Sequence, residues 1–193
     1  MTSDIIVILK RDPLSRGRFQ MYVAYAGKKR SLCNTRQKGW MDESMAAQEN
    51  VALARSLLEM YNSRQSDPAW LDKSGAAFAA DCEVIDIPSG TTLHGPDGYK
   101  RLVRFFAVAF PDSRTKLTNA FATEDQVTLE FTSRGTNIGL LHLPSQVIPA
   151  TGRSFELRIC EVLQIRNGKI VRFHTYYDMT TLLEQLGLNS AKR

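Results

Sequence analysis

The hydrophobic period of this chain changes once, and the change limits the folds open to it. Before Pro111, apolar residues recur at helical spacing, as in the stripe of Val51, Ala54 and Leu58. After Pro111 they alternate with polar residues at the period of two that is typical of half-buried strands. Helices followed by a run of strands predict an α+β fold, with helices on one face of a mostly antiparallel sheet.

Caps, prolines and turn residues give the expected boundaries of the elements. Ser44 is a good N-cap for the first helix, and Asp67-Pro68 starts a short second helix. We expect helices over residues 44–62, 68–77 and 95–110, strands over 82–87, 115–122, 127–136, 154–166 and 169–177, and a last helix over 179–186.

The front of the chain differs from the rest in charge. The first forty residues carry nine Lys/Arg and two Asp, a net charge of +7, whereas the rest carries sixteen Lys/Arg and eighteen Asp/Glu, a net charge of −2. Two strand-like runs, Ile5 to Leu9 and Phe19 to Tyr25, could form a hairpin, but two strands alone are marginal in water. We therefore expect residues 1–43 to be a basic appendage, poorly ordered or a loose hairpin, and residues 44–193 to be the folded domain.

Composition and charge exclude several functional classes. The longest aliphatic run, Ile5 to Leu9, is far shorter than the roughly 20 residues of a membrane span, and no secretory signal pattern is visible. The near-neutral body has no electrostatic footprint for phosphate, so we expect no nucleic-acid partner. The three cysteines, Cys33, Cys82 and Cys160, fit a reducing cytoplasm. Neither they nor the three histidines have metal-ligand spacing, so the sequence predicts a cytoplasmic protein without a metal site.

The turn between the last two strands constrains their pairing. Asn167-Gly168 is typical of a type I′ turn with two loop residues. If the register continues from that turn without interruption, Glu161 faces His174, and Asp178 lies further along the same face. The other side chains expected on this face are Phe155, Leu157, Ile159, Leu163, Ile165, Arg172 and Tyr176.

This mixture of apolar and ionisable side chains predicts the wall of a partly apolar cavity. A core wall has no reason to contain Glu161, His174 and Asp178 together, because buried ionisable groups are costly unless paired. Each group also has a purely structural interpretation. Asp178 could be the N-cap of the last helix, His174 and Glu161 a cross-strand charge pair, and Asp86 a turn residue.

The reverse face of this hairpin is too apolar to be simply solvated. We expect a second subunit to cover it, which predicts a homodimer. The residues expected on it are Val171, Phe173, Tyr177, Cys160 and Val162.

Seven short motifs follow one another in order between about residues 45 and 188. They are Ala80-Asp81-Cys82-Glu83-Val84-Ile85-Asp86, His94-Gly95-Pro96-Asp97-Gly98, Ala109-Phe110-Pro111-Asp112, Arg134-Gly135-Thr136-Asn137-Ile138-Gly139, Pro149-Ala150-Thr151-Gly152-Arg153, Asn167-Gly168-Lys169-Ile170, and Asp178 through Gln185-Leu186-Gly187. In this order they resemble the SnoaL-like polyketide cyclases, or ester cyclases, of the nuclear-transport-factor-2-like superfamily.

This resemblance implies a cone-shaped α+β barrel with three helices around an apolar pocket, often as a homodimer. Characterised cyclases of the family close a ring by intramolecular aldol condensation of a polyketide ester, using a carboxylate as acid/base and no cofactor. The acidic residue that ends the last strand in the family matches Asp178, and the position that is commonly Trp or His matches His174. Asn137 stands where the family often has a histidine.

We therefore expect a cofactor-free cyclase or isomerase of a small hydrophobic carbonyl compound, with Asp178, His174 and Glu161 as catalytic residues. We expect substrate contacts from Tyr176, Asp86, Asn137, Trp70 and Phe110. The alternative is a non-catalytic module that binds a small hydrophobic ligand in the same pocket or a protein partner on the sheet, and the loss of the histidine at Asn137 favours it. Fold alone does not decide between them.

Overall fold

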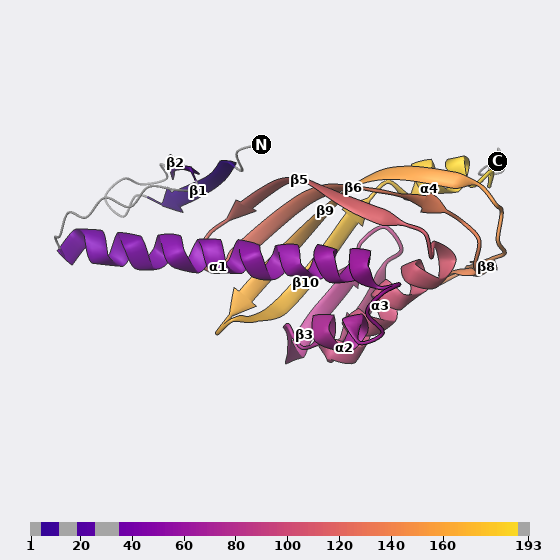
Figure 1. Ribbon diagram of the computed structural model, residues 1–193, viewed down its shortest axis with the longest axis horizontal. Coiled ribbons are helices and arrows are strands. Elements are labelled where there is room, and N and C mark those ends of the chain that lie inside the picture. The colour runs from indigo at the N-terminus through magenta and orange to yellow at the C-terminus, as the bar shows by residue number, and fades with distance from the viewer. Residues whose placement is uncertain (1–4, 12–18, 26–34, 189–193) are drawn as a thin grey trace.

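The computed structural model describes residues 5–11, 19–25 and 35–188 of the 193-residue chain. Helices cover one face of a curved sheet, which confirms the predicted α+β class (Figure 1). The elements in chain order are β1 (Ile5–Arg11), β2 (Phe19–Tyr25), α1 (Thr35–Ser63), α2 (Trp70–Gly75), β3 (Phe78–Asp86), β4 (Thr91–His94), α3 (Gly95–Ala109), β5 (Arg114–Ala122), β6 (Gln126–Thr136), β7 (Leu141–Leu143), β8 (Gln146–Ile148), β9 (Ser154–Arg166), β10 (Lys169–Tyr177) and α4 (Met179–Gln185).

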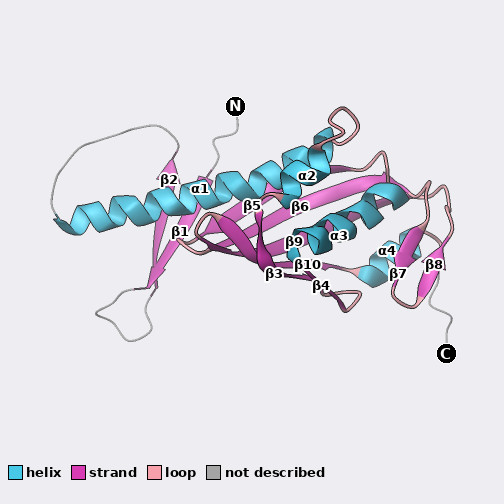
Figure 2. Cartoon of the chain, turned by 90° about the horizontal axis from the view of Figure 1, so that it is seen from below, coloured by secondary structure: helices cyan, strands magenta, loops and turns pink. Residues whose placement is uncertain are grey.

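The long helix α1 packs across β5 and β6, and α3 packs along β3 (Figure 2). As predicted, α1 buries Val51, Ala54 and Leu58. The predicted start at Ser44 is wrong, because the helix begins at Thr35. Residues 35–43 contain no proline, so the helix can extend to positions before Ser44. The capping chemistry of Ser44 alone does not make the helix start there.

The main sheet has eight strands in the order β2-β1-β5-β6-β9-β10-β3-β4. Its pairs are antiparallel except β1 with β5 and β10 with β3, which are parallel. The sheet is curved but open, since β2 and β4 are its two edges and no pairing between described strands closes it into a barrel. The strand β4 and the small β7–β8 hairpin were not predicted, because strands of three or four residues are too short to show an alternating pattern.

The turn between β9 and β10 has the predicted geometry, with positive φ at both Asn167 and Gly168. Arg166 pairs with Lys169 as expected, but the register shifts by one residue between Ile170 and Arg172. The extra residue of this β-bulge reverses the face on which every later side chain of β10 lies. The predicted register beyond the bulge is therefore wrong.

The first two strands pair along their whole length, and β1 also joins β5 through Val7 opposite Phe121 and Ile8 opposite Ala122. The hairpin that the sequence allowed is thus present at one edge of the sheet. The domain boundary at residue 43 stays a prediction.

Two hydrophobic clusters hold the fold together. The larger lies between the helices and the middle of the sheet and contains Val84, Tyr99, Leu129 and Phe173. The smaller lies where α3 ends and α4 begins, and contains Phe110, Phe155, Leu157, Leu141, Ile148, Leu182 and Leu186. Within the described ranges, no helix is long and apolar enough to cross a membrane.

Candidate active site

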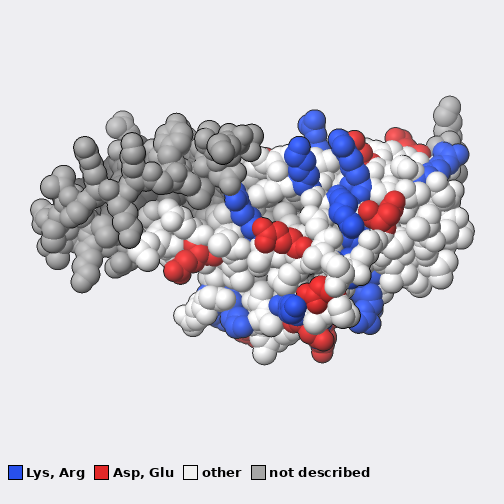
Figure 3. Space-filling view, in the orientation of Figure 1, with Lys and Arg blue, Asp and Glu red and all other residues white. Residues whose placement is uncertain are grey.

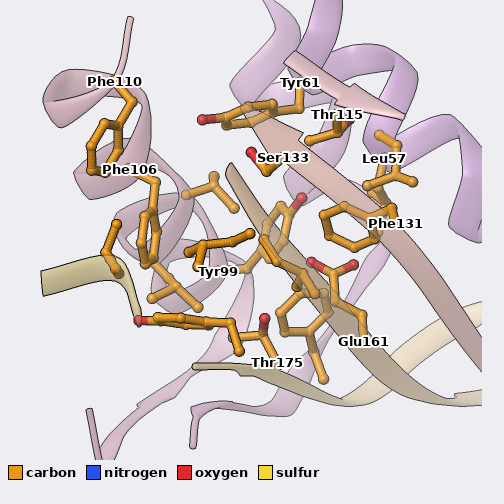
Figure 4. A pocket seen from close by; sticks show the side chains of 18 of the residues that line it. Leu57, Tyr61, Tyr99, Phe106, Phe110, Thr115, Phe131, Ser133, Glu161 and Thr175 are labelled. Atoms are coloured by element: carbon orange, nitrogen blue, oxygen red, sulfur yellow. The ribbon is translucent and has the colours of Figure 1, made fainter. Parts of the chain in front are cut away.

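A cavity of about 100 Å³ lies between the helices and the sheet, where the two hydrophobic clusters meet (Figure 4). Because about 10–15 Å³ suffices for one water, this volume can hold a ligand of several heavy atoms. Aromatic rings dominate its wall. They are Tyr61, Tyr99, Phe106, Phe110, Phe131, Phe155, Phe173 and Tyr177.

Among the described residues that line this cavity, Glu161 supplies the only carboxyl group, and none is a lysine, an arginine or a histidine. Its side chain comes from the middle of β9, and Figure 4 shows its carboxyl group near the rings of Tyr99 and Phe131. Within the described part of the chain, the carboxyl group has no hydrogen-bond or ion-pair partner. Burial disfavours its charged form and raises the pKa of Glu161 from 4.5 to about 8.

Hydroxyl groups are the other polar groups of the wall. Thr175 lies directly opposite Glu161 on β10, whereas Thr115 and Ser133 come from β5 and β6. The Tyr61 hydroxyl lies 2.9 Å from Oγ of Ser113 and is hydrogen-bonded to it, and Ser113 does not line the cavity.

His174 and Tyr176 lie on the face of the sheet opposite to the cavity, contrary to prediction. The bulge pairs His174 with Val162, whereas Thr175 takes the predicted place opposite Glu161. The partner of His174 is instead Glu83, at 3.7 Å from Nε2 to Oε1. Tyr176 is 39% exposed on this outer face, and its hydroxyl oxygen lies 3.4 Å from Nδ1 of His174.

The same shift contradicts the predicted apolar outer face. Phe173 is 2% exposed within the main core, and Tyr177 lines the cavity. The outer face carries Arg172 in addition to His174 and Tyr176. Dimerisation through this face stays a prediction.

Asp178 is the N-cap of α4, which was one of its two sequence-based interpretations. Its Oδ1 accepts from the backbone N–H of Thr181 at 3.0 Å, and its Oδ2 accepts from the Thr181 hydroxyl at 2.6 Å. These hydrogen bonds lower the pKa of Asp178. The side chain is exposed and does not line the cavity. The structure therefore shows capping, and gives this carboxyl group no access to a ligand bound in the cavity.

Asp86 is 4% exposed and lies behind Tyr177. The Tyr177 hydroxyl donates to Oδ2 of Asp86 at 3.2 Å, and the Ser89 hydroxyl donates to the same atom at 2.6 Å. Burial raises the pKa of Asp86, and the two hydrogen bonds oppose that effect. Asp86 is not a lining residue, so it can reach a ligand only through Tyr177.

Asn137 is fully buried and holds a loop instead of lining the cavity. Its amide nitrogen donates to the carbonyl oxygens of Ala109 and Gly139, and its side-chain oxygen accepts from the N–H and the hydroxyl of Thr151. These contacts join the end of α3 to the segment before β9.

The two aromatic residues predicted to contact substrate lie in different places. Phe110 is 1% exposed, lines the cavity and packs on Phe155 at 4.4 Å between ring centroids. Trp70 does not line the cavity, but its ring meets the lining residue Tyr61 edge-on at 5.9 Å.

The sequence reasoning missed Thr175 and Tyr177 as cavity residues. A signal for them exists, because the bulky apolar residues Ile170 and Phe173 are separated by three positions instead of two or four, so strict alternation cannot bury both. Strict alternation from Ile170 would also place Arg172 in the cavity, at a high desolvation cost. Both features favour a bulge near Val171.

The family model for SnoaL-like polyketide cyclase matches residues 52–186. No curated protein matches the chain significantly.

Among solved structures, one similar protein is IdmH of Streptomyces antibioticus, a proposed polyketide cyclase. It is 26% identical, with a TM-score of 0.55 over 71% of this chain and 97% of that one. A proposed SnoaL-like polyketide cyclase of a Jannaschia species is 14% identical, with a TM-score of 0.64 over 86% of this chain and 100% of that one. AclR of Streptomyces galilaeus, a proposed hydroxylase, is 22% identical, with a TM-score of 0.59 over 74% of this chain and 87% of that one.

Proposed function

Because the chain belongs to the SnoaL-like polyketide cyclase family, we propose that it is a cofactor-free cyclase or isomerase of a small hydrophobic carbonyl compound. The observation that carries the proposal is the Glu161 carboxyl group, which faces an aromatic cavity and has no hydrogen-bond or ion-pair partner among the described residues. We assign to Glu161 the acid/base role that the family resemblance implies for Asp178, because the Asp178 carboxyl group is occupied as a helix cap.

The chemistry needs one group that both accepts and returns a proton. The Glu161 carboxylate would remove a proton from a carbon between two carbonyl groups, which leaves a delocalised enolate. In a cyclisation, the enolate carbon forms a bond with a second carbonyl carbon of the same molecule, and the resulting alkoxide takes the proton back from Glu161. In an isomerisation of a β,γ-unsaturated ketone, Glu161 would remove a proton from the carbon between the carbonyl group and the C=C double bond, and the resulting dienolate would take the proton back at the far carbon of that double bond. Neither sequence of steps consumes an oxidant, a reductant or a metal ion.

The environment of Glu161 suits this role. A pKa of about 8 leaves both protonation states accessible near neutral pH, which is where a general acid/base is most effective. A positioned carboxyl group contributes about 10²–10⁴ in rate, and holding a flexible chain in a folded conformation adds to it. The aromatic wall favours an apolar ligand, and the lack of a lining cation disfavours an anionic one.

The test is turnover of a model polyketide ester and of a β,γ-unsaturated ketone by the wild type and by Glu161→Gln. Glutamine keeps the shape and hydrogen-bonding capacity of the side chain but cannot carry the proton. We expect turnover to fall about 10²–10⁴-fold while ligand affinity changes little. Glu130→Gln is the matched control, since Glu130 lies exposed on the neighbouring strand β6. Equal turnover by Glu161→Gln and the wild type would contradict the proposal.

A non-catalytic binding module is the second candidate function. It is favoured by the absence, among the lining residues, of any other group that titrates near neutral pH and could share the work with Glu161. A wild-type protein that binds these ketones but turns over neither of them would support it.

A further inference from the structure

A row of three oxygen-bearing side chains crosses neighbouring strands at the cavity. Glu161 on β9 pairs with Thr175 on β10, and Thr175 pairs with Asp86 on β3. Side chains that are paired across strands lie on the same face of a sheet, so the two carboxyl groups flank Thr175 about two strand spacings, or about 10 Å, apart. The side chain of Tyr177, two residues beyond Thr175, stands between Asp86 and the cavity.

The direction of the hydrogen bond between Tyr177 and Asp86 depends on where Asp86 carries a proton. Oδ2 of Asp86 receives the hydroxyls of Tyr177 and Ser89, at 3.2 and 2.6 Å, whereas Oδ1 is buried without a partner among the described residues. An ionised carboxylate accepts at Oδ2, and so does a carboxylic acid protonated on Oδ1. Tyr177 is therefore the donor when Asp86 is ionised and when Asp86 carries its proton on Oδ1.

A phenol has a single proton, and Tyr177 uses its proton on Asp86. The Tyr177 oxygen then still has a lone pair, which can accept a hydrogen bond from a hydroxyl group of a ligand. Protonated Glu161 offers the complementary group, a donor to a carbonyl oxygen.

We propose that Asp86 is a positioning residue that fixes Tyr177 as a hydrogen-bond acceptor, so that the cavity selects ligands with a hydroxyl or enol group in addition to the carbonyl group. This inference rests on the proposed function for placing the ligand beside Glu161, and it adds that protonated Glu161 donates to the carbonyl oxygen of the ligand. It names the ligand class as hydroxylated or enolised ketones, in which donor and acceptor lie at separate positions of one apolar skeleton.

The test is calorimetric binding at pH 6.5 of 4-hydroxyacetophenone and 6-acetyl-2-naphthol, each compared with its methyl ether. In neither compound can the hydroxyl bond internally to the carbonyl. We expect the wild type to bind each hydroxyketone about three- to tenfold more tightly than its ether, which is the range of one neutral hydrogen bond. The result is the ratio of the two affinities, for hydroxyketone and for ether, measured on the same protein. A variant that binds both ligands more weakly by the same factor therefore leaves this ratio unchanged.

Three variants identify the cause of the preference. Tyr177→Phe removes the acceptor, and Asp86→Leu frees the Tyr177 proton to turn into the cavity, so both should reduce the ratio to below about twofold. Asp86→Asn retains an oxygen acceptor for Tyr177 and should keep the ratio of the wild type. A merely structural role of Asp86 would not predict this rescue.

The outcomes separate this inference from the proposed function. The inference is overturned if the wild type binds hydroxyketone and ether equally, or if Asp86→Leu keeps the wild-type ratio. Neither result bears on turnover by Glu161, which is measured separately. A clear hydroxyl preference in a protein that turns over no ketone supports the inference and contradicts catalysis. If the wild type binds none of the ketones, both are contradicted.

Discussion

Replacing Glu161 by glutamine should make the folded protein more stable at neutral pH. The folded state keeps the pKa of Glu161 at about 8, whereas the unfolded chain has the ordinary value of 4.5. Between these two pH values the folded state binds more protons than the unfolded state, so stability falls as pH rises. Glutamine does not titrate, so Glu161→Gln does not lose stability in this way as the pH rises.

The size of the effect follows from the shift. Each pH unit above 4.5 costs the folded state about 1.4 kcal/mol, so the ionisable side chain costs about 3 kcal/mol at pH 7. In a chain of this size the gain corresponds to an increase in Tm of about 6–12 °C.

Urea unfolding of the wild type and Glu161→Gln at pH 5, 6, 7 and 8 measures the difference directly. We expect it to be below about 1 kcal/mol at pH 5 and to grow with each pH unit up to pH 8. The control Glu130→Gln, at an exposed position of β6, should follow the wild type at every pH. Parallel stability curves for the wild type and Glu161→Gln would refute the raised pKa of Glu161, and with it the claim that burial tunes this side chain for acid/base chemistry.

Four further predictions concern the rest of the molecule. Asp178→Ala should lose about 0.5–2 kcal/mol of unfolding free energy, Asp178→Asn should lose almost none, and turnover by Asp178→Asn should equal that of the wild type, because Asn caps a helix about as well as Asp. Asn137→Ala removes the donor to the Gly139 carbonyl oxygen and the acceptor of the Thr151 N–H and hydroxyl, so denaturation should show a loss of about 1–3 kcal/mol. Deleting residues 1–34 should leave the unfolding midpoint nearly unchanged, since β1 joins β5 over only two residue pairs, and a drop of many degrees would contradict this. If a second copy covers the outer face of the sheet, sedimentation should detect a dimer of the wild type and monomers of Tyr176→Glu.

The sequence was sufficient to predict most elements of the fold, because long segments with a clear period carry their own boundaries. The helix stopped by Pro111 and the strands β9 and β10 are where the spacing and the Asn167-Gly168 turn predict them. Glu161 was placed correctly because the alternation along β9 alone decides its face.

The rest of the site depends on one interruption of the alternation along β10. A single extra residue in β10, at Val171, exchanges the faces of all later side chains, so His174 and Tyr176 leave the cavity and Thr175 and Tyr177 enter it. Tertiary contacts decide such a bulge, because burying Phe173 is favourable and burying a charged neighbour is not.

The most direct test of the central claim follows proton transfer at a ligand carbon without requiring ring closure. A 1,3-dicarbonyl ester is incubated in D₂O with the wild type, Glu161→Gln or Glu130→Gln, and NMR measures deuterium incorporation at the carbon between the carbonyl groups. If Glu161 is the acid/base, the wild type and Glu130→Gln accelerate exchange over the buffer rate, and Glu161→Gln loses about 10²–10⁴ of that acceleration. Exchange by Glu161→Gln at the wild-type rate would show that the cavity carboxyl group does not carry the proton.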